Sequence, residues 1–275
     1  MRQRYVSFAG QSLALEYSRE FSGMVDFLYE DTDSVSTGAP AVKFRLHRVD
    51  GKMTLLKGSK YLYQGNDEAA LATILIRETI RSLIDQNADG LALHAAALSR
   101  NGKGILLPGR SGCGKTSLST WLASRGFNYL TDEYVFIGNN TNTIQAFARP
   151  PNVKVRGIEE ALQRFFDMNK HEGQTLKGKQ VAMIPTRLLN PGNKRECPSV
   201  DLILFPDFKK NSSFRLEELS KAQLGLALME SLVNARNLVG HGLGEVTRLA
   251  RTSTSYRLKY GAFDQLGEAF DRILP

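Results

Sequence analysis

The sequence predicts an α/β fold in which a mixed, twisted sheet surrounds a phosphate-binding loop. A short apolar run, Ile105-Leu106-Leu107, has the length of a buried strand. A glycine-rich stretch follows it directly, and Leu118, Trp121 and Leu122 then recur at helical spacing. Two adjacent acidic residues precede a second strand candidate, 134–137. Strand, glycine-rich loop and helix in this order are typical of a phosphate-binding unit.

The glycine-rich stretch matches the pattern G-x-x-x-x-G-K-[ST] in full. Glycines at these positions let backbone N–H groups approach phosphate oxygens. The lysine of such a loop reaches the β- and γ-phosphates, and the hydroxyl after it ligates Mg²⁺. We therefore predict that ATP and Mg²⁺ bind at Gly109, Arg110, Ser111, Gly112, Cys113, Gly114, Lys115, Thr116 and Ser117.

Composition excludes several classes of protein. With 275 residues, 42% hydrophobic and 23% charged, the chain is typical of globular proteins. No apolar run approaches the roughly 20 residues that span a bilayer, so we expect no membrane partner. Charged residues interrupt the first twenty positions, which does not fit a secretory signal. The only cysteines are Cys113, inside the loop, and Cys197, which favours a reducing, cytoplasmic location.

The net charge of +8 is compatible with a nucleic-acid partner. The basic residues are spread along the chain, however, and concentrate only weakly at 177–179, 194–195 and 209–210. An acidic protein substrate would respond to the same positive field. Nucleic acid is therefore the less favoured partner.

Residues 1–65 predict a β-rich region without recognisable chemistry, followed by a core over 66–275, either as a second domain or as part of one continuous domain. Asp50-Gly51 is a hairpin turn signal between two of the predicted strands. Asn66 or Asp67 caps a predicted helix that runs to about residue 86. The expected strands of this region are 5–8, 13–17, 42–49 and 53–56, with a loop over 31–40.

His94 lies in an apolar segment, 91–98, that we expect to pair as a hairpin with the strand before the phosphate loop. A lone histidine in an apolar strand is often a satisfied core residue. Because the segment lies next to the predicted phosphate loop, a functional role for His94 is favoured equally. Both interpretations stay open from sequence alone.

Further elements are expected along the rest of the chain. They are a strand at 144–148, a helix at 158–166, a polar loop at 170–181, a strand at 202–205, a helix from a capping box at Ser220 to Ala235, a strand at 255–260 and a closing helix over 263–273.

The acidic pair Asp132-Glu133 supplies the second half of the predicted site. Magnesium–nucleotide chemistry needs a carboxylate for the metal, and a kinase acting on an alcohol needs a base near the γ-phosphate. The alternative is a turn carrying two solvated acids. The proximity of the pair to the loop favours Thr116, Asp132 and Glu133 as Mg²⁺ ligands.

Together these motifs resemble the HPr kinase/phosphorylase family and its related serine kinases, whose fold is similar to that of phosphoenolpyruvate carboxykinase. The resemblance is carried by His94 in His-Ala-Ala-Ala-Leu, by the Gly-Arg-Ser-Gly-Cys-Gly-Lys-Thr loop and by Leu-Thr-Asp-Glu at 130–133. A Tyr-Arg-Leu-x-Tyr-Gly strand at 256–261 extends it toward the end of the chain.

The resemblance implies roles for individual residues. Asp132 would be the base that accepts the proton of the acceptor hydroxyl, and His94 would hydrogen-bond that carboxylate. Arg187, in Ile-Pro-Thr-Arg at 184–187, would contact the transferred phosphoryl group, with Lys154 as a second candidate. Glu133 replaces a second aspartate of the family pattern. The catalytic set predicted in this way is Asp132, His94, Lys115 and Arg187.

Two departures from the pattern bear on the substrate. Arg156-Gly157-Ile158 is only a fragment of the signature of the bifunctional enzymes, and no long N-terminal regulatory region is present. We therefore expect an acceptor other than HPr and no phosphorylase reaction.

The sequence thus predicts an ATP- and Mg²⁺-dependent kinase acting on a Ser or Thr hydroxyl of a protein or peptide. One alternative is a small-molecule or RNA kinase, which the high positive charge would suit. Another is a nucleotide-sensing ATPase regulator without an acceptor. Members of the family often form hexamers or smaller rings, but nothing in this sequence marks an interface, so a homo-oligomer stays an open alternative.

Overall fold

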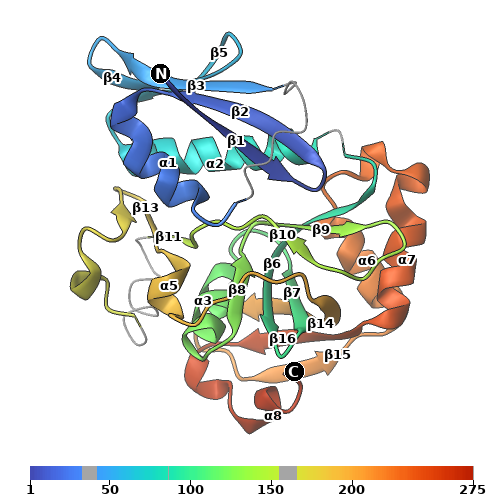
Figure 1. Ribbon diagram of the computed structural model, residues 1–275. Helices are drawn as coiled ribbons and strands as arrows, with labels where there is room; N and C mark the ends of the chain where they lie inside the picture. Colours follow the sequence, from blue (N-terminus) through green and yellow to red (C-terminus); the bar gives the residue numbers. More distant parts are fainter. Residues whose placement is uncertain (33–41, 86, 155–165, 275) are drawn as a thin grey trace. The chain divides into compact units, whose positions relative to one another are not determined.

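The computed structural model describes residues 1–32, 42–85, 87–154 and 166–274 (Figure 1). Its contacts form two compact units, one of Met1–Asn87 with Phe147–Leu189 and the other of Ala88–Ala146 with Asn190–Pro275. Most of the loop predicted at 31–40, nearly all of the helix predicted at 158–166 and the Arg156-Gly157-Ile158 fragment lie outside the described residues.

The first unit is built on a five-stranded sheet whose strands follow chain order. Only β2 and β3 run parallel, and the other neighbours are antiparallel. Asp50 and Gly51 turn the β3–β4 hairpin with φ of 49° and 74°, as the sequence predicts. The strands are β1 (Arg2–Phe8), β2 (Gln11–Tyr17), β3 (Lys43–Val49), β4 (Lys52–Lys57) and β5 (Lys60–Gly65).

Two helices accompany this sheet. α1 (Ser22–Tyr29) was not predicted, whereas α2 (Glu68–Ile84) begins at the expected cap, where the Asp67 carboxylate accepts from Ala70 N at 3.0 Å. α2 contacts β2, β4 and β5. Its apolar face therefore belongs to the N-terminal sheet, and the compact unit does not end at the predicted boundary of residue 65.

A small sheet completes the first unit. β13 (Val181–Met183) lies between β11 (Asn152–Lys154) and β12 (Leu176–Lys177). The predicted polar loop at 170–181 thus contains a strand, and it begins within a 3-10 turn, η2 (Met168–His171). A single helical turn, α5 (Thr186–Leu189), follows β13.

The second unit contains a mixed sheet in the order β10-β9-β6-β7-β14-β16-β15, with β8 paired to β6. β14 runs parallel to both β7 and β16, and the remaining pairs are antiparallel. The strands are β6 (Gly90–Arg100), β7 (Lys103–Pro108), β8 (Asn128–Thr131), β9 (Tyr134–Gly138), β10 (Gln145–Ala146), β14 (Ser199–Phe208), β15 (Arg215–Glu218) and β16 (Thr254–Tyr260). The mixed sheet and the β6–β7 hairpin confirm the prediction.

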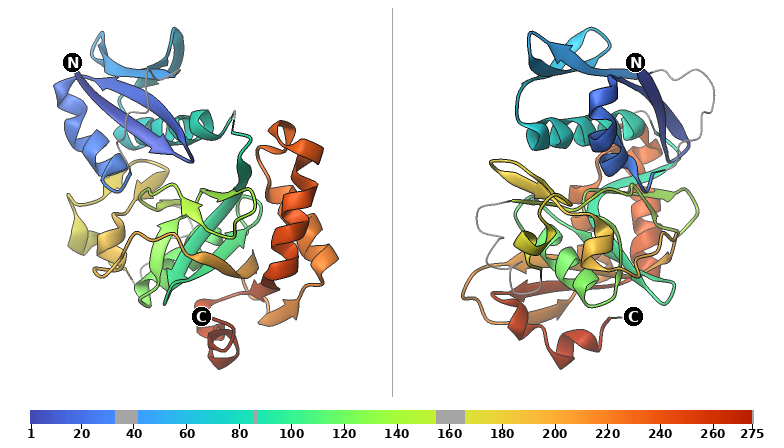
Figure 2. Two further views of the ribbon diagram at one scale, coloured as in Figure 1. Left: turned by 45° about the vertical axis from the view of Figure 1, so that its right-hand side comes forward. Right: turned by 60° about the vertical axis from the view of Figure 1, so that its left-hand side comes forward.

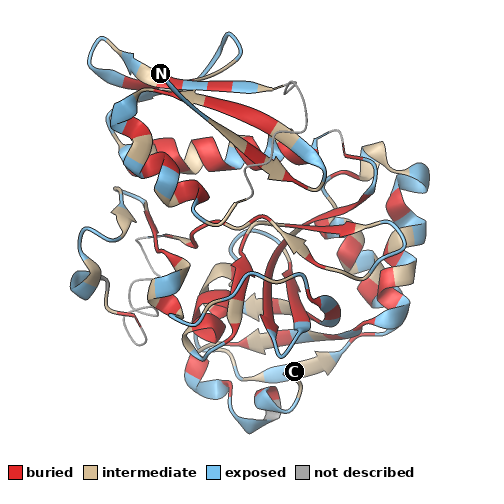
Figure 3. Ribbon diagram, in the orientation of Figure 1, coloured by how far each residue is buried: buried red, intermediate tan, exposed pale blue. Residues whose placement is uncertain are grey.

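Helices cover this sheet. The odd-numbered apolar residues of β6 share a core with α6 (Lys221–Ser231) and α7 (Leu243–Thr252), which lie side by side in Figure 2. The even-numbered Ala92, Ala96 and Leu98 are equally buried, so β6 is covered on both faces (Figure 3). α3 (Lys115–Ser124) contacts β6, β7 and β8.

Two predicted helices differ from the structure at their ends. The Ser220 capping box is present, but α6 stops at Ser231 because Leu232 is extended, with φ −77° and ψ 121°. The predicted closing helix is wrong as a single element. It divides into a 3-10 turn, η5 (Phe263–Gln265), and a short α8 (Glu268–Asp271), because Leu266 and Gly267 leave the helical region. No helix among the described residues has the length and apolarity to cross a membrane.

Asn234 attaches the chain after α6 to β6, the strand that carries His94. Its side-chain amide donates to Gly90 O at 2.9 Å, and its side-chain oxygen accepts from Ala92 N at 2.9 Å. The residue is only 2% exposed. The side chain therefore satisfies two buried backbone groups that water does not reach.

Replacing Asn234 by Ala is expected to lower the free energy of unfolding by about 2 kcal/mol or more, because buried backbone groups lose their partners. Urea unfolding measures the change. Asn139→Ala is the control, since Asn139 makes only a 3.4 Å bond to Ala88 O at an exposed position. It should change stability by less than about 0.5 kcal/mol. Equal effects of the two substitutions would contradict this role of Asn234.

Candidate functional site

The loop that carries the G-x-x-x-x-G-K-T pattern joins β7 to α3. Gly109, Gly112 and Gly114 have φ of 146°, 88° and 104°, a region that side-chain-bearing residues rarely adopt. A Cβ on Gly114 would lie 2.9 Å from Phe208 Cβ and 3.1 Å from Tyr260 Oη. Glycine is therefore required there both by backbone conformation and by space.

The loop rests on the carboxyl ends of two neighbouring strands, β14 and β16. Phe208 N, at the end of β14, donates to Cys113 O at 3.0 Å. Tyr260, at the end of β16, packs its ring against Phe208 at 5.3 Å between centroids. The Tyr260 hydroxyl is buried without a hydrogen-bond partner among the described residues, and this burial raises its pKa. The ends of β14 and β16 thus hold the loop in place.

Lys115 folds back over the start of the loop. Its Nζ donates to Gly109 O at 2.6 Å and to Arg110 O at 3.1 Å, and the residue is only 6% exposed. Burial lowers the pKa of Lys115, while the nearby charge of Cys113 and, after it, of Glu133 acts in the opposite direction. The ammonium group is thus held at the end of the loop where β7 finishes.

The acidic pair lies between β8 and β9. Thr116 Oγ1 donates to Asp132 Oδ2 at 3.2 Å, and Asp132 is only 4% exposed. Glu133 O accepts from Ala95 N of β6 at 3.1 Å. The structure therefore brings together Thr116 and Asp132, as the sequence predicts, and fixes the backbone of Glu133 to the histidine-bearing strand.

His94 lies beside this pair. Its Nδ1 is 3.0 Å from Glu133 O and 4.0 Å from Glu133 Oε1. Burial lowers the pKa of His94 below its usual value of 6.5, and the positive charge of Lys115 lowers it further. The half-buried ring thus belongs to the candidate site, which favours the functional interpretation of this histidine. A hydrogen bond from His94 to the Asp132 carboxylate stays a prediction.

The hydroxyl and carboxylate oxygens of Thr116 and Asp132 are of the kind that Mg²⁺ binds. The part of the chain that the structure describes has no cluster of three or more His, Cys, Asp or Glu side chains that could hold a metal. Mg²⁺ is commonly bound by only one or two carboxylates together with phosphates and water. Thr116 and Asp132 meet that requirement, and Glu133 is the adjacent carboxylate.

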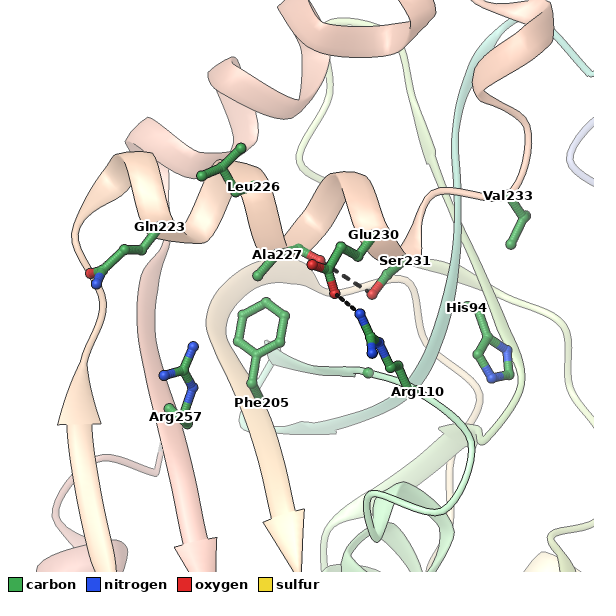
Figure 4. A pocket seen from close by; sticks show the side chains of 11 residues that line it. His94, Arg110, Phe205, Gln223, Leu226, Ala227, Glu230, Ser231, Val233 and Arg257 are labelled. Atoms are coloured by element: carbon green, nitrogen blue, oxygen red, sulfur yellow. Dashed lines mark hydrogen bonds and ion pairs between the residues drawn. The ribbon is translucent and has the colours of Figure 1, made fainter.

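A cavity of about 500 Å³ opens at the start of the loop (Figure 4). Three strands contribute to it, with His94 on β6, Phe205 on β14 and Arg257 on β16. Phe205 and Arg257 are direct neighbours in the sheet. Its remaining wall is one side of α6. The lining residues are His94, Gly109, Arg110, Phe205, Gln223, Leu226, Ala227, Glu230, Ser231, Val233 and Arg257.

Sequence analysis missed most of this lining. Phe205 looks like an ordinary strand residue, and Arg257 like one of many dispersed cations. Glu230 has no neighbouring motif. The only available signal was the family-like strand at 256–261, which does not distinguish Arg257 from its neighbours.

Arg187 and Lys154 belong to the first unit. Arg187 lies on α5, where its Nη1 pairs with Glu30 Oε2 at 2.9 Å. Lys154 ends β11. Their predicted roles at the phosphoryl group therefore stay predictions, because these residues belong to a different compact unit from the loop.

Comparisons with known proteins give little further guidance. No protein-family model and no curated protein matches the sequence. Among solved structures, the HPr(Ser) kinase/phosphatase from Coxiella burnetii is similar with a TM-score of 0.33 and 13% identity, over 66% of this chain and 92% of that one. A TM-score this low does not support the transfer of an activity or of residue roles.

Replacing Gly114 by Ala is expected to lower the free energy of unfolding by more than about 1 kcal/mol, because the new Cβ meets backbone strain and the β14 end together. Urea unfolding measures the effect. The control is Gly225→Ala in α6, where a Cβ has no atom within 4 Å. That substitution should stabilise by about 0.5–1 kcal/mol. A stable Gly114→Ala protein would show that the loop is free to move off the strand.

His94 is expected to titrate below pH 6.5, because burial and Lys115 disfavour its charged form. Proton NMR of the imidazole carbons across pH 4–9 measures this, with His94→Gln to identify its signal among the four histidines. The ring should be neutral at pH 7. A midpoint above 6.5 would indicate that the carboxylates, rather than burial, control the ring.

Proposed function

We propose that this protein is an ATP- and Mg²⁺-dependent kinase that transfers the γ-phosphate to a hydroxyl group, with Ser or Thr of a protein or peptide as the acceptor. The observation that carries the proposal is the hydrogen bond between Thr116 of the G-K-T sequence and the buried carboxylate of Asp132, at 3.2 Å. A phosphate-loop hydroxyl and a carboxylate in contact form the pair that magnesium–nucleotide chemistry uses.

The loop residues would bind the triphosphate. The positive backbone φ of Gly112 and Gly114 lets N–H groups turn toward an anion, and α3 begins at Lys115 with its positive dipole end at the same place. Lys115 Nζ would exchange its two carbonyl partners for β- and γ-phosphate oxygens. Thr116 with Asp132 or Glu133 would hold Mg²⁺, which when bound neutralises charge on the phosphates.

Asp132 would accept the proton of the acceptor hydroxyl. It is buried next to the loop, so a proton-accepting oxygen lies within the same small site as the phosphate-binding groups. His94, whose pKa is lowered by burial, would hold the backbone of Glu133 through the contact at 3.0 Å. Arg187 is a proposed further contributor that would stabilise charge during transfer.

Asp132→Asn is expected to reduce phosphoryl transfer by about 10²- to 10⁴-fold, the usual contribution of a general base, while Mg-ATP binding is largely kept. Purified protein is incubated with γ-labelled ATP, Mg²⁺ and a lysate of its source cell. Asp201→Asn serves as the control, because Asp201 is an exposed residue on β14. It should transfer label as the wild type does.

Three outcomes would redirect the proposal. Near-normal transfer by Asp132→Asn removes this residue from the mechanism. Label that disappears with nuclease rather than protease identifies a nucleic-acid acceptor, and binding should then fall steeply with salt. ATP binding without transfer to any fraction identifies a nucleotide-sensing regulator.

A further inference from the structure

The cavity beside the loop adjoins the γ-phosphate end of the proposed nucleotide site. Lys115 Nζ, the group that reaches the β- and γ-phosphates in such loops, lies 2.6 Å from Gly109 O and 3.1 Å from Arg110 O. Both of these residues line the cavity. A molecule in the cavity would therefore lie next to the phosphate that is transferred.

His94 connects the same cavity to the acidic pair. Its ring lines the cavity, and its Nδ1 contacts Glu133 O at 3.0 Å. The same nitrogen is 4.0 Å from Glu133 Oε1, and Glu133 directly follows Asp132 in the chain. A hydroxyl of a molecule bound next to His94 would thus lie near Asp132, the proposed base.

The charges of the lining do not cancel. Arg110 Nη2 pairs with Glu230 Oε2 at 3.3 Å, as drawn in Figure 4. The Arg257 guanidinium makes no ion pair or hydrogen bond with any residue that the structure describes, and the side chain is exposed beside Phe205. Glu217, its partner in register on β15, pairs with Arg215 at 4.0 Å. One guanidinium is therefore available for an anionic group of a ligand, and its planar fork suits a carboxylate or a phosphate.

The wall opposite the strands is apolar and exposed. Leu226 and Val233, two large apolar side chains, are 72% and 42% exposed. Phe205, Ala227 and Leu226 lie toward the Arg257 side of the cavity, and Val233 lies near His94 (Figure 4). A volume of about 500 Å³ holds a small molecule or a few residues of a peptide.

We infer that this cavity is the acceptor pocket, and that it selects a hydroxyl-bearing acceptor with an anionic group, bound by Arg257, on an apolar frame. The assignment of the ligand as an acceptor rests on the proposed kinase function. The binding of an apolar anion rests on the lining alone. The anionic group can belong to a free hydroxy acid or to a peptide segment, and the experiment separates these sources.

The first test measures binding without nucleotide, with the full chain. The probes are 4-(4-fluorophenyl)butyrate and its neutral amide. Their binding is measured by ¹⁹F NMR. Wild type should bind the acid at least about tenfold more tightly than the amide, because the carboxylate gains a charge-assisted contact. Arg257→Gln should abolish this preference and leave the weak binding of the amide unchanged. Arg257→Lys should retain part of it.

Arg251→Gln is the matched control, because Arg251 is an exposed cation near the end of α7, outside the cavity lining. It should bind both probes as the wild type does. Equal binding of acid and amide, an unchanged acid preference in Arg257→Gln, or no binding of the acid would each overturn the inference. Thermal melting of each variant verifies that it is folded.

The second test uses label transfer from ATP. The acid probe should inhibit transfer into the lysate fraction that holds the acceptor, and the amide should not. Label in a protease-sensitive fraction identifies a peptide-borne anion, and label in the small-molecule fraction identifies a free hydroxy acid. Failure of the acid to inhibit transfer would overturn the role as an acceptor pocket. Mg-ATP binding is measured separately. If Mg-ATP does not bind, the proposed kinase function is refuted, whereas the result of the probe-binding test is unaffected.

Discussion

The hydrogen bond from Phe208 N to Cys113 O joins the glycine-rich loop to the sheet, and the geometry of the candidate site depends on it. It brings the loop so close to the ends of β14 and β16 that Gly114 has no room for a Cβ. With the loop fixed, α3 begins at a defined point, and Thr116 reaches Asp132. The loop is therefore a part of the sheet edge rather than an independent flexible segment.

The topology explains why so many functional candidates meet at this edge. β7, β14 and β16 run parallel, so their carboxyl ends lie together, which is where α/β sheets commonly bind ligands. β6 runs the other way, and its first half extends past the end of β7. His94 thus reaches the loop from a strand whose remaining residues form the core.

Local signals made part of this predictable from the sequence. The loop, the β6–β7 hairpin and the Asp67 and Ser220 caps depend on a few neighbouring residues, and they were placed correctly. α7 was missed although Leu243, Val246 and Ala250 recur at helical spacing, a pattern that is short and stands among polar residues. The closing helix failed because the sequence pattern does not show that Leu266 and Gly267 leave the helical conformation.

The cavity could not be predicted in the same way. Its lining combines Arg110, Phe205 and Arg257, which are remote along the chain and share no motif. Only the pairing of β14 with β16 places the last two next to each other. Residues that are brought together by the order of strands in a sheet show no recurring spacing in the sequence.

The order of the strands also sets the distance between the loop and Arg257. Ile203 pairs with Leu106, and Phe205 with Arg257, so Pro108, Phe205 and Arg257 lie in one row across three strands. Neighbouring strands are about 4.8 Å apart, which places the Arg257 backbone about 10 Å from the start of the glycine-rich loop. An extended peptide covers this span in about three residues. This distance across the sheet would favour acceptors whose hydroxyl and anionic group are further apart than those of a single serine.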